Sequence, residues 1–192
     1  FWALFDQIGT LWQVQARELD RTLPDWIPLF GGMEMLAAQV SAVWNPLFIL
    51  LLIPVFSYFI YPFLGRFIEI TPLAKIAAGL WVAGLAFAMV SIIQIQVDAG
   101  YTPSVFWQVL ACLVLTAAEV LVSITCLEFA YTQAPHSMKS VIMALFLLTV
   151  SLGNYLASGL KFLLVDSQGH PLLLGADEFW FWTILVCIAA FS

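Results

Sequence analysis

The stretch SVFWQVLACLVLTAAEVLVSITCLEFAY covers residues 104–131 and is mostly apolar, although it contains two carboxylates, Glu119 and Glu128. A helix needs about 20 consecutive apolar residues to cross the hydrocarbon core of a bilayer. Because this stretch exceeds that length, it predicts a membrane-spanning helix.

The composition of the whole chain leads to the same conclusion. Of its 192 residues, 63% are hydrophobic and only 9% are charged, whereas a soluble domain has roughly 25% charged residues and about half apolar ones. So few charges cannot cover a water-facing surface, and the remaining apolar surface must face lipid. The 8 Trp and 16 Phe agree with this, since Trp gathers at membrane interfaces.

Several function classes are disfavoured by the same residues. The net charge of −6 and the scattered Lys and Arg argue against a nucleic-acid partner. Cys112, Cys126 and Cys187 lie in apolar runs without metal-binding spacing, so we interpret them as buried hydrophobic residues and expect no metal or other cofactor. His136 and His170 fall in predicted loops, and no hydrolase motif accompanies them. We therefore expect that the protein is not an enzyme.

Six apolar segments divide the chain, and short polar turns separate them. We predict one transmembrane bundle over residues 1–192, with helices at about 1–16, 35–63, 73–97, 104–131, 140–165 and 178–192. Prolines predict kinks in the second segment, and Gly79 with Ala83 predicts close helix packing in the third. Since the last segment is too short to span a bilayer, we expect an all-α integral membrane protein that is truncated at both ends.

Two carboxylates stand out because each lies inside an apolar run. Placing Asp at the centre of a membrane helix costs roughly 2.5–3.5 kcal/mol, so Asp6 and Glu119 call for an explanation. Thr116, Glu119 and Ser123 follow an i, i+3, i+7 spacing and share one helix face. Two interpretations stay open for Glu119: a ligand or proton site, or a structural residue that a neighbouring helix satisfies.

Asp6 follows Trp2 by one turn, so both side chains lie on one face. Burial favours the neutral form of a carboxylate unless a cation pairs with it. Asp6 is thus a candidate for taking up and releasing a proton, with a position near the water interface as the alternative. No Lys or Arg of this chain is at clearly comparable depth, so we expect a partner cation from another part of the protein.

The remaining polar residues have simpler interpretations. Glu128 is interpreted as a cap or a salt-bridge partner near the turn that holds Lys139. Asn45 is either an N-cap followed by Pro46 or an amide that faces a cavity at a kink. One face of the fifth segment carries polar residues that we interpret as contacts between helices, namely Ser151, Asn154 and Ser158.

Four motifs, taken together, resemble the proton-dependent oligopeptide transporters. LEFAYTQAPHSMKS at 127–140 and LLTVSLGN at 147–154 are similar to the signature around the tenth and eleventh helices of that family. FWALFDQIGT at 1–10 resembles its seventh helix, and WNPLFILLLIPVF at 44–56 resembles its eighth. The motifs occur in the family's order and extend over nearly the whole chain.

The resemblance implies the C-terminal six-helix bundle of a major facilitator superfamily transporter, with the turns holding Arg66 and Lys139 in the cytoplasm. It implies symport of di- and tripeptides into the cell with protons as the coupling ion, by alternating access. The expected partners are the peptide, protons, the lipid bilayer and a missing N-terminal half of the same protein, but no nucleic acid. The short loop at 98–103, where animal members carry a large domain, favours a bacterial protein of the inner membrane.

The resemblance also implies roles for individual residues. The substrate-binding residues would be Trp2, Asn45, Glu119, Ser123 and Phe146, and the proton-coupling residues would be Asp6 and Glu119. Glu119 resembles the carboxylate that receives the peptide amino terminus. Phe146 departs from the family, because many members have Trp there and Phe lacks the indole N–H.

Two alternatives to peptide symport remain. The first is a related transporter for nitrate or a drug-like compound, although an amine-binding Glu119 argues against nitrate. The second is a structural membrane subunit, in which Asp6 and Glu119 would have no evident use.

Overall fold

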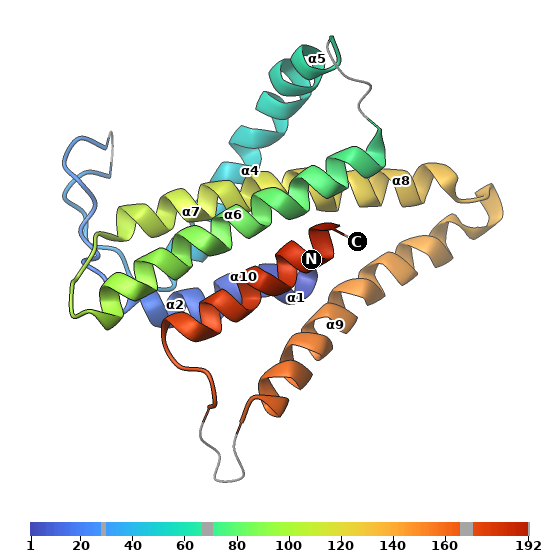
Figure 1. Cartoon of the computed structure of the whole chain (residues 1–192). Helices are drawn as coiled ribbons and strands as arrows, with labels where there is room; N and C mark the ends of the chain where they lie inside the picture. The colour runs from blue at the N-terminus through green and yellow to red at the C-terminus, as the bar shows by residue number, and fades with distance from the viewer. Residues whose placement is uncertain (28–29, 67–70, 166–170, 192) are drawn as a thin grey trace.

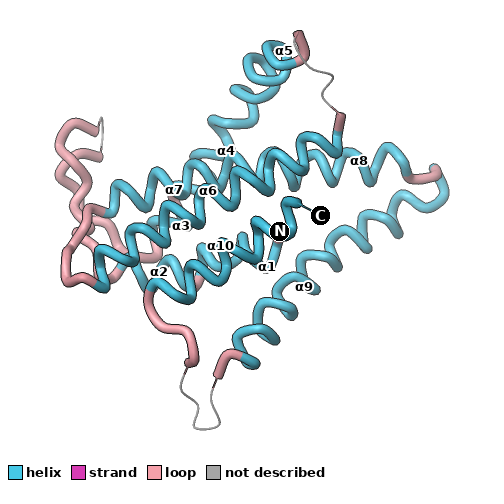
Figure 2. Tube along the Cα trace, in the orientation of Figure 1, coloured by secondary structure: helices cyan, strands magenta, loops and turns pink. Residues whose placement is uncertain are grey.

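The computed structural model describes residues 1–27, 30–66, 71–165 and 171–191. Within these residues the ordered elements are helices joined by loops, and the β-pairing is limited to isolated bridges (Figures 1 and 2). Four continuous helical stretches are long and apolar enough to cross a membrane: Gln39–Phe63, Pro72–Asp98, Val105–Gln133 and Lys139–Leu163. The predicted all-α membrane fold is confirmed.

The first of these stretches contains α3 (Gln39–Ala42), α4 (Trp44–Val55), η2 (Phe56–Ile60) and most of α5 (Tyr61–Leu64). The next is α6 (Pro72–Asp98), and the third contains α7 (Val105–Glu119), η3 (Val120–Ile124) and α8 (Thr125–Gln133). A short turn, η4 (His136–Met138), leads to α9 (Lys139–Leu163), and α10 (Ala176–Phe191) follows. Residues 166–170, with His170, and residue 192 lie outside the described residues.

The first segment differs from the continuous helix predicted over 1–16. It consists of α1 (Trp2–Phe5), the 3₁₀ turn η1 (Asp6–Gly9) and α2 (Leu11–Ala16), and Thr10 between them has non-helical dihedrals of φ −126° and ψ −81°. The Thr10 hydroxyl donates to Gln7 Oε1 at 3.3 Å. Such local bonds compete with helical ones, and Gly9 disfavours a helix, so the helix breaks here.

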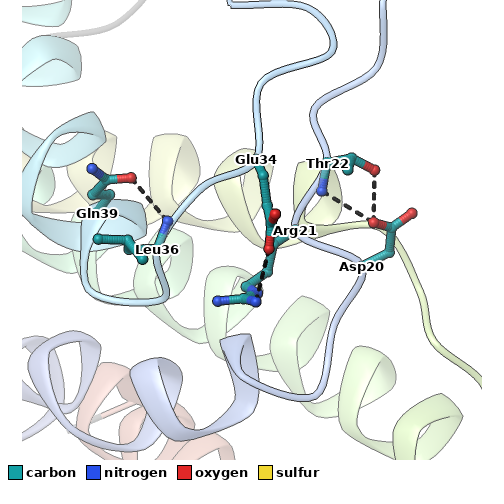
Figure 3. A network of polar contacts seen from close by, with 6 residues as sticks. All are labelled: Asp20, Arg21, Thr22, Glu34, Leu36 and Gln39. Atoms are coloured by element: carbon teal, nitrogen blue, oxygen red, sulfur yellow. Dashed lines mark hydrogen bonds and ion pairs between the residues drawn. The ribbon is translucent and has the colours of Figure 1, made fainter.

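The second segment begins at Gln39 rather than near residue 35. Met35 N donates to Arg21 O at 2.9 Å, and Arg21 forms a 2.9 Å ion pair with Glu34, so this part of the chain pairs with the preceding loop (Figure 3). Gln39 Oε1 then accepts a bond from Leu36 N at 2.9 Å. Pro54 lies inside α4, and the π-helical turn η2 follows directly.

Asp20 and Thr22 fix the other arm of this loop. Asp20 Oδ1 accepts bonds from the Thr22 hydroxyl at 2.6 Å and from Thr22 N at 3.0 Å (Figure 3). These bonds, the hydroxyl bond foremost, hold the pKa of the exposed Asp20 carboxyl below its usual value. Asp20 N also donates to Pro103 O at 3.0 Å, which ties the loop to the start of α7.

Helix α6 is central to the packing, with α7 on one side and α10 on another. Close approach at Gly79 was predicted, and a Cβ atom there would meet Val122 Cγ2 at 2.5 Å. Helix α9 packs on α1 instead, where a Cβ on Gly153 would meet Trp2 Cβ at 2.6 Å. The helices α4 to α5 and α9 lean away from the group formed by α6, α7 and α10 (Figure 1).

Candidate functional site

Two residues that are 71 positions apart in sequence meet where α4 packs on α7. The Thr116 hydroxyl donates to Asn45 Oδ1 at 2.7 Å. Helix α4 begins at Trp44, with Val43 as its N-cap. Asn45 is therefore not an N-cap, and its amide faces a neighbouring helix. Glu119 follows Thr116 by about one turn along α7.

Glu119 is the last residue of α7 and is half-buried. Its Oε2 atom is buried and has no hydrogen-bond partner among the described residues, and the same is true of Ser123 Oγ. A buried polar atom without a partner costs about 1–3 kcal/mol. The π-helical turn η3, which holds Ser123, begins immediately after Glu119, and such turns are frequent at functional sites.

Asp6 lies at the point where the first segment breaks, and it is half-buried. It interacts electrostatically with Glu119, although the two residues come from opposite parts of the sequence. In the part of the chain that the structure describes, the ion pairs are Arg21–Glu34 at 2.9 Å and Lys161–Glu178 at 3.4 Å. Neither pair contains Asp6 or Glu119, so both carboxylates lack a cation within this part.

Aromatic rings of α1, which directly precedes Asp6, contact a ring of α9. Trp2 and Phe146 are in edge-to-face contact, with ring centroids 6.4 Å apart and an interplanar angle of 82°. Phe5 adds a second edge-to-face contact to Trp2 at 6.0 Å. Gly153 makes this contact between α1 and α9 possible, because it leaves room for the Trp2 backbone.

Other polar residues lie in environments that differ from those predicted from the sequence. Glu128 is exposed and forms no ion pair within the described residues, whereas Lys139 Nζ lies 4.1 Å from the centre of the Tyr131 ring. Ser151, Asn154 and Ser158 on α9 are exposed, and no hydrogen bond joins them to another helix among the described residues. The contact of α9 with α1 is made at Gly153 instead.

A cluster of buried glutamines was missed by sequence reasoning. Gln15, Gln94 and Gln108 are 2%, 6% and 0% exposed, and they bond to one another. A signal was available, since each amide lies inside an apolar segment where burial needs hydrogen bonds. The sequence alone does not tell which helix faces meet, so the partners were not foreseeable.

Comparison with solved structures gives the class first: a helical membrane bundle of the major facilitator type. The POT family transporter PepTSo matches with a TM-score of 0.82 and 34% identity, over 100% of this chain and 37% of that chain. An auto-inhibited POT family peptide transporter matches with a TM-score of 0.78 and 33% identity, over 100% of this chain and 37% of that chain.

The family follows from the sequence. The PTR2 model of the POT family matches residues 1–179, and the chain belongs to that family. Peptide transporter PTR2 of Saccharomyces cerevisiae is 35% identical over 140 residues, which is 66% of this chain and 23% of that protein. Protein NRT1/PTR FAMILY 8.5 of Arabidopsis thaliana is 30% identical over 185 residues, 92% of this chain and 29% of that protein. The chain thus spans less than a third of the length of these relatives.

Proposed function

We propose that this chain is the C-terminal bundle of a transporter that imports di- and tripeptides together with protons, by alternating access. The observation that carries the proposal is Glu119 on a POT-family fold, because its Oε2 atom is buried and has no hydrogen-bond partner among the described residues. Glu119 lies one turn from Thr116, whose hydroxyl bonds Asn45. The relatives named as peptide transporters favour a peptide substrate.

Recognition of a peptide requires opposite charges at a fixed separation, because a peptide is a zwitterion. Glu119 is the anionic pole and pairs with the peptide ammonium, while Asn45 bonds its backbone and Ser123 adds a hydroxyl. The rings of Trp2 and Phe146 form an apolar wall for side chains. The cation that pairs with the peptide carboxylate comes from the N-terminal half.

Proton coupling uses the interaction between Asp6 and Glu119. Because the two carboxylates interact electrostatically, the charge state of one changes the free energy of charging the other. A proton taken up from outside therefore alters how strongly Glu119 holds an ammonium group. The membrane potential adds about 2.3 kcal/mol per charge per 100 mV to the driving force.

The orientation and location are part of the same proposal. The turns that hold Arg66 and Lys139 lie in the cytoplasm, and the short turn at 98–103 lies outside. That turn favours a bacterial inner membrane, although the relatives named above are eukaryotic.

The test is uptake of labelled dialanine into liposomes that contain the full-length protein, driven by an inward proton gradient. Wild type should concentrate the peptide, Glu119→Gln should not, and Glu128→Gln should transport normally. The Glu128→Gln variant is a matched control, since its exposed carboxylate belongs to the same helical stretch. Unimpaired uptake by Glu119→Gln would make Glu119 structural. If wild type ignores a panel of dipeptides, the substrate is a different compound.

A further inference from the structure

A chain of buried side-chain amides joins helices near the end of the bundle that holds the turn at 98–103. Gln108 Nε2 on α7 donates to Trp12 O at 2.8 Å and to Gln15 Oε1 at 3.0 Å. Gln15 Nε2 on α2 donates in turn to Gln94 Oε1 at 2.8 Å and to Val90 O at 3.1 Å. Both hydrogens of each of these two amide groups are therefore used, and three helices share one network.

The chain continues to a fourth helix. Gln94 Nε2 donates to Asp98 Oδ1 at 2.9 Å, and the other oxygen of that carboxylate accepts a bond from Ala176 N at 2.8 Å, at the start of α10. Gly175, with φ +55°, lies against Asp98, where a Cβ atom would be 2.4 Å from Oδ2. The network thus extends from α7 through α2 and α6 to the first turn of α10.

Separation of these helices would be costly. Each buried amide that loses its partner costs about 1–3 kcal/mol. The low dielectric constant of the interior also strengthens hydrogen bonds, and linked hydrogen bonds polarise one another. Sliding α2 along α6 would break the bonds of Gln15 with Gln94 and Val90 at once. The bonds fix the register of α2, which apolar packing alone would leave less strictly defined.

The α1 part of the first segment has different partners. It packs on α9, whereas α2 is bonded to α6 and α7. The two parts are separated by η1 and by Thr10, whose dihedrals are non-helical, and a Cβ atom on Gly9 would have open space around it. The segment is therefore rigidly held on one side of residues 6–10 and attached to a different helix on the other.

We propose that the amide chain is a clamp that makes α2 move as one body with α6, α7 and α10, so that the first segment bends at residues 6–10. Gln15, Gln94 and Gln108 are then positioning residues, which act through the helices they join. The proposal depends on the proposed function only in requiring a conformational change, and not on the identity of the substrate.

Electron paramagnetic resonance distances between spin labels test the clamp. Labels on Val14 and Gln96, both exposed, report the distance from α2 to α6, and labels on Val14 and Leu156 report the distance from α2 to α9. They are introduced as cysteines into a cysteine-free full-length protein, and measured at pH 5 and pH 8, with and without dialanine. We expect one narrow α2–α6 distance under all conditions, and an α2–α9 distance that changes.

Gln15→Leu should broaden the α2–α6 distribution at every pH. Gln13→Leu is the matched control, because Gln13 is on the same helix but bonds Ser41 at 3.1 Å outside the clamp. If Gln15→Leu does not fold, the double variant Gln15→Leu with Gln94→Leu removes both partners and leaves fewer unpaired groups.

An α2–α6 distance that varies in wild type, or stays narrow in the variants, overturns the clamp. A constant α2–α9 distance overturns bending at residues 6–10. A narrow α2–α6 distance in wild type that broadens in Gln15→Leu supports the clamp whether or not the protein takes up peptide, so failure of uptake alone would refute only the proposed function.

Discussion

Two polar regions lie inside this bundle, and their hydrogen-bonding differs. In the clamp, neutral amides bond one another across helices, and both hydrogens of Gln15 Nε2 and of Gln108 Nε2 have acceptors, although Gln108 Oε1 is buried without a partner among the described residues. In the candidate site, a carboxylate oxygen and a hydroxyl, Glu119 Oε2 and Ser123 Oγ, have no partner among the described residues. Satisfied polar groups stabilise a structure, whereas unsatisfied ones are retained at a cost in free energy. The clamp therefore gains free energy from most of its polar atoms, whereas the free oxygens of Glu119 and Ser123 contribute none to the fold.

The largest effect is expected from removing charge at the candidate site. Glu119→Gln should lower proton-driven dialanine uptake by about 100-fold, because a hydrogen bond to a charged group is worth about 1.5–3 kcal/mol. Its unfolding midpoint should change little, because Oε2 has no hydrogen-bond partner among the described residues that would be lost. Uptake in liposomes and thermal unfolding in detergent measure the two quantities. A large loss of stability with normal uptake would show that Glu119 holds the fold and does not bind the substrate.

At the clamp, a substitution should lower the stability of the protein. Gln15→Leu should lower the free energy of unfolding by about 2–3 kcal/mol, because Gln108 Nε2 and Gln94 Oε1 lose a buried partner. Denaturant unfolding measures this change, and Gln13→Leu serves as the control. Equal stability of the two variants would show that the clamp contributes nothing to the fold.

Steric packing supplies a third comparison, without polar groups. Gly79→Ala should destabilise the bundle by about 1–3 kcal/mol, since overpacking of a close contact costs that much and the new methyl would meet Val122 at 2.5 Å. Gly159→Ala in α9 meets nothing within 4 Å, and it should stabilise the helix by up to about 1 kcal/mol. Thermal midpoints that move in the same direction for both variants would contradict this assignment.

The smallest effect is expected in the exposed loop. Thr22→Val removes the hydroxyl bond that lowers the pKa of Asp20, so this pKa should rise toward its usual value. Because the folded pKa is depressed, the stabilisation is present above the unfolded pKa and is lost as the pH falls through the folded one. An NMR titration of the Asp20 carboxyl carbon measures the shift. An unchanged pKa would mean that the bond from Thr22 N is sufficient.

Much of the fold follows from the sequence, because long apolar runs determine where helices can span. The stretch predicted at 104–131 spans Val105–Gln133 in the structure. The break at residues 6–10 was not predicted, since it depends on local bonds of Gln7 and Thr10. The start of α3 depends on a backbone bond between Met35 and Arg21, which no local pattern reveals.

For the candidate site too, the sequence predicts some features, whereas others depend on contacts between helices. The cost of burying a carboxylate marks Asp6 and Glu119 in the sequence. Their mutual interaction joins residues from opposite parts of the chain, so it depends on how η1 lies relative to α7. The partner of Asn45 likewise depends on the contact between α4 and α7. Burial cost can be read from a sequence, but which side chains meet cannot.

A ribosome makes the broken first segment well before it makes the helices that hold it. Asp6 discourages insertion by itself, since a carboxylate at mid-helix costs roughly 2.5–3.5 kcal/mol on insertion scales. The Gln94 and Gln108 partners of α2 are synthesised later, and Gly153, which receives α1, later still. The hydrogen bonds that hold α2 and the packing contact that holds α1 can therefore form only after the later helices have been synthesised.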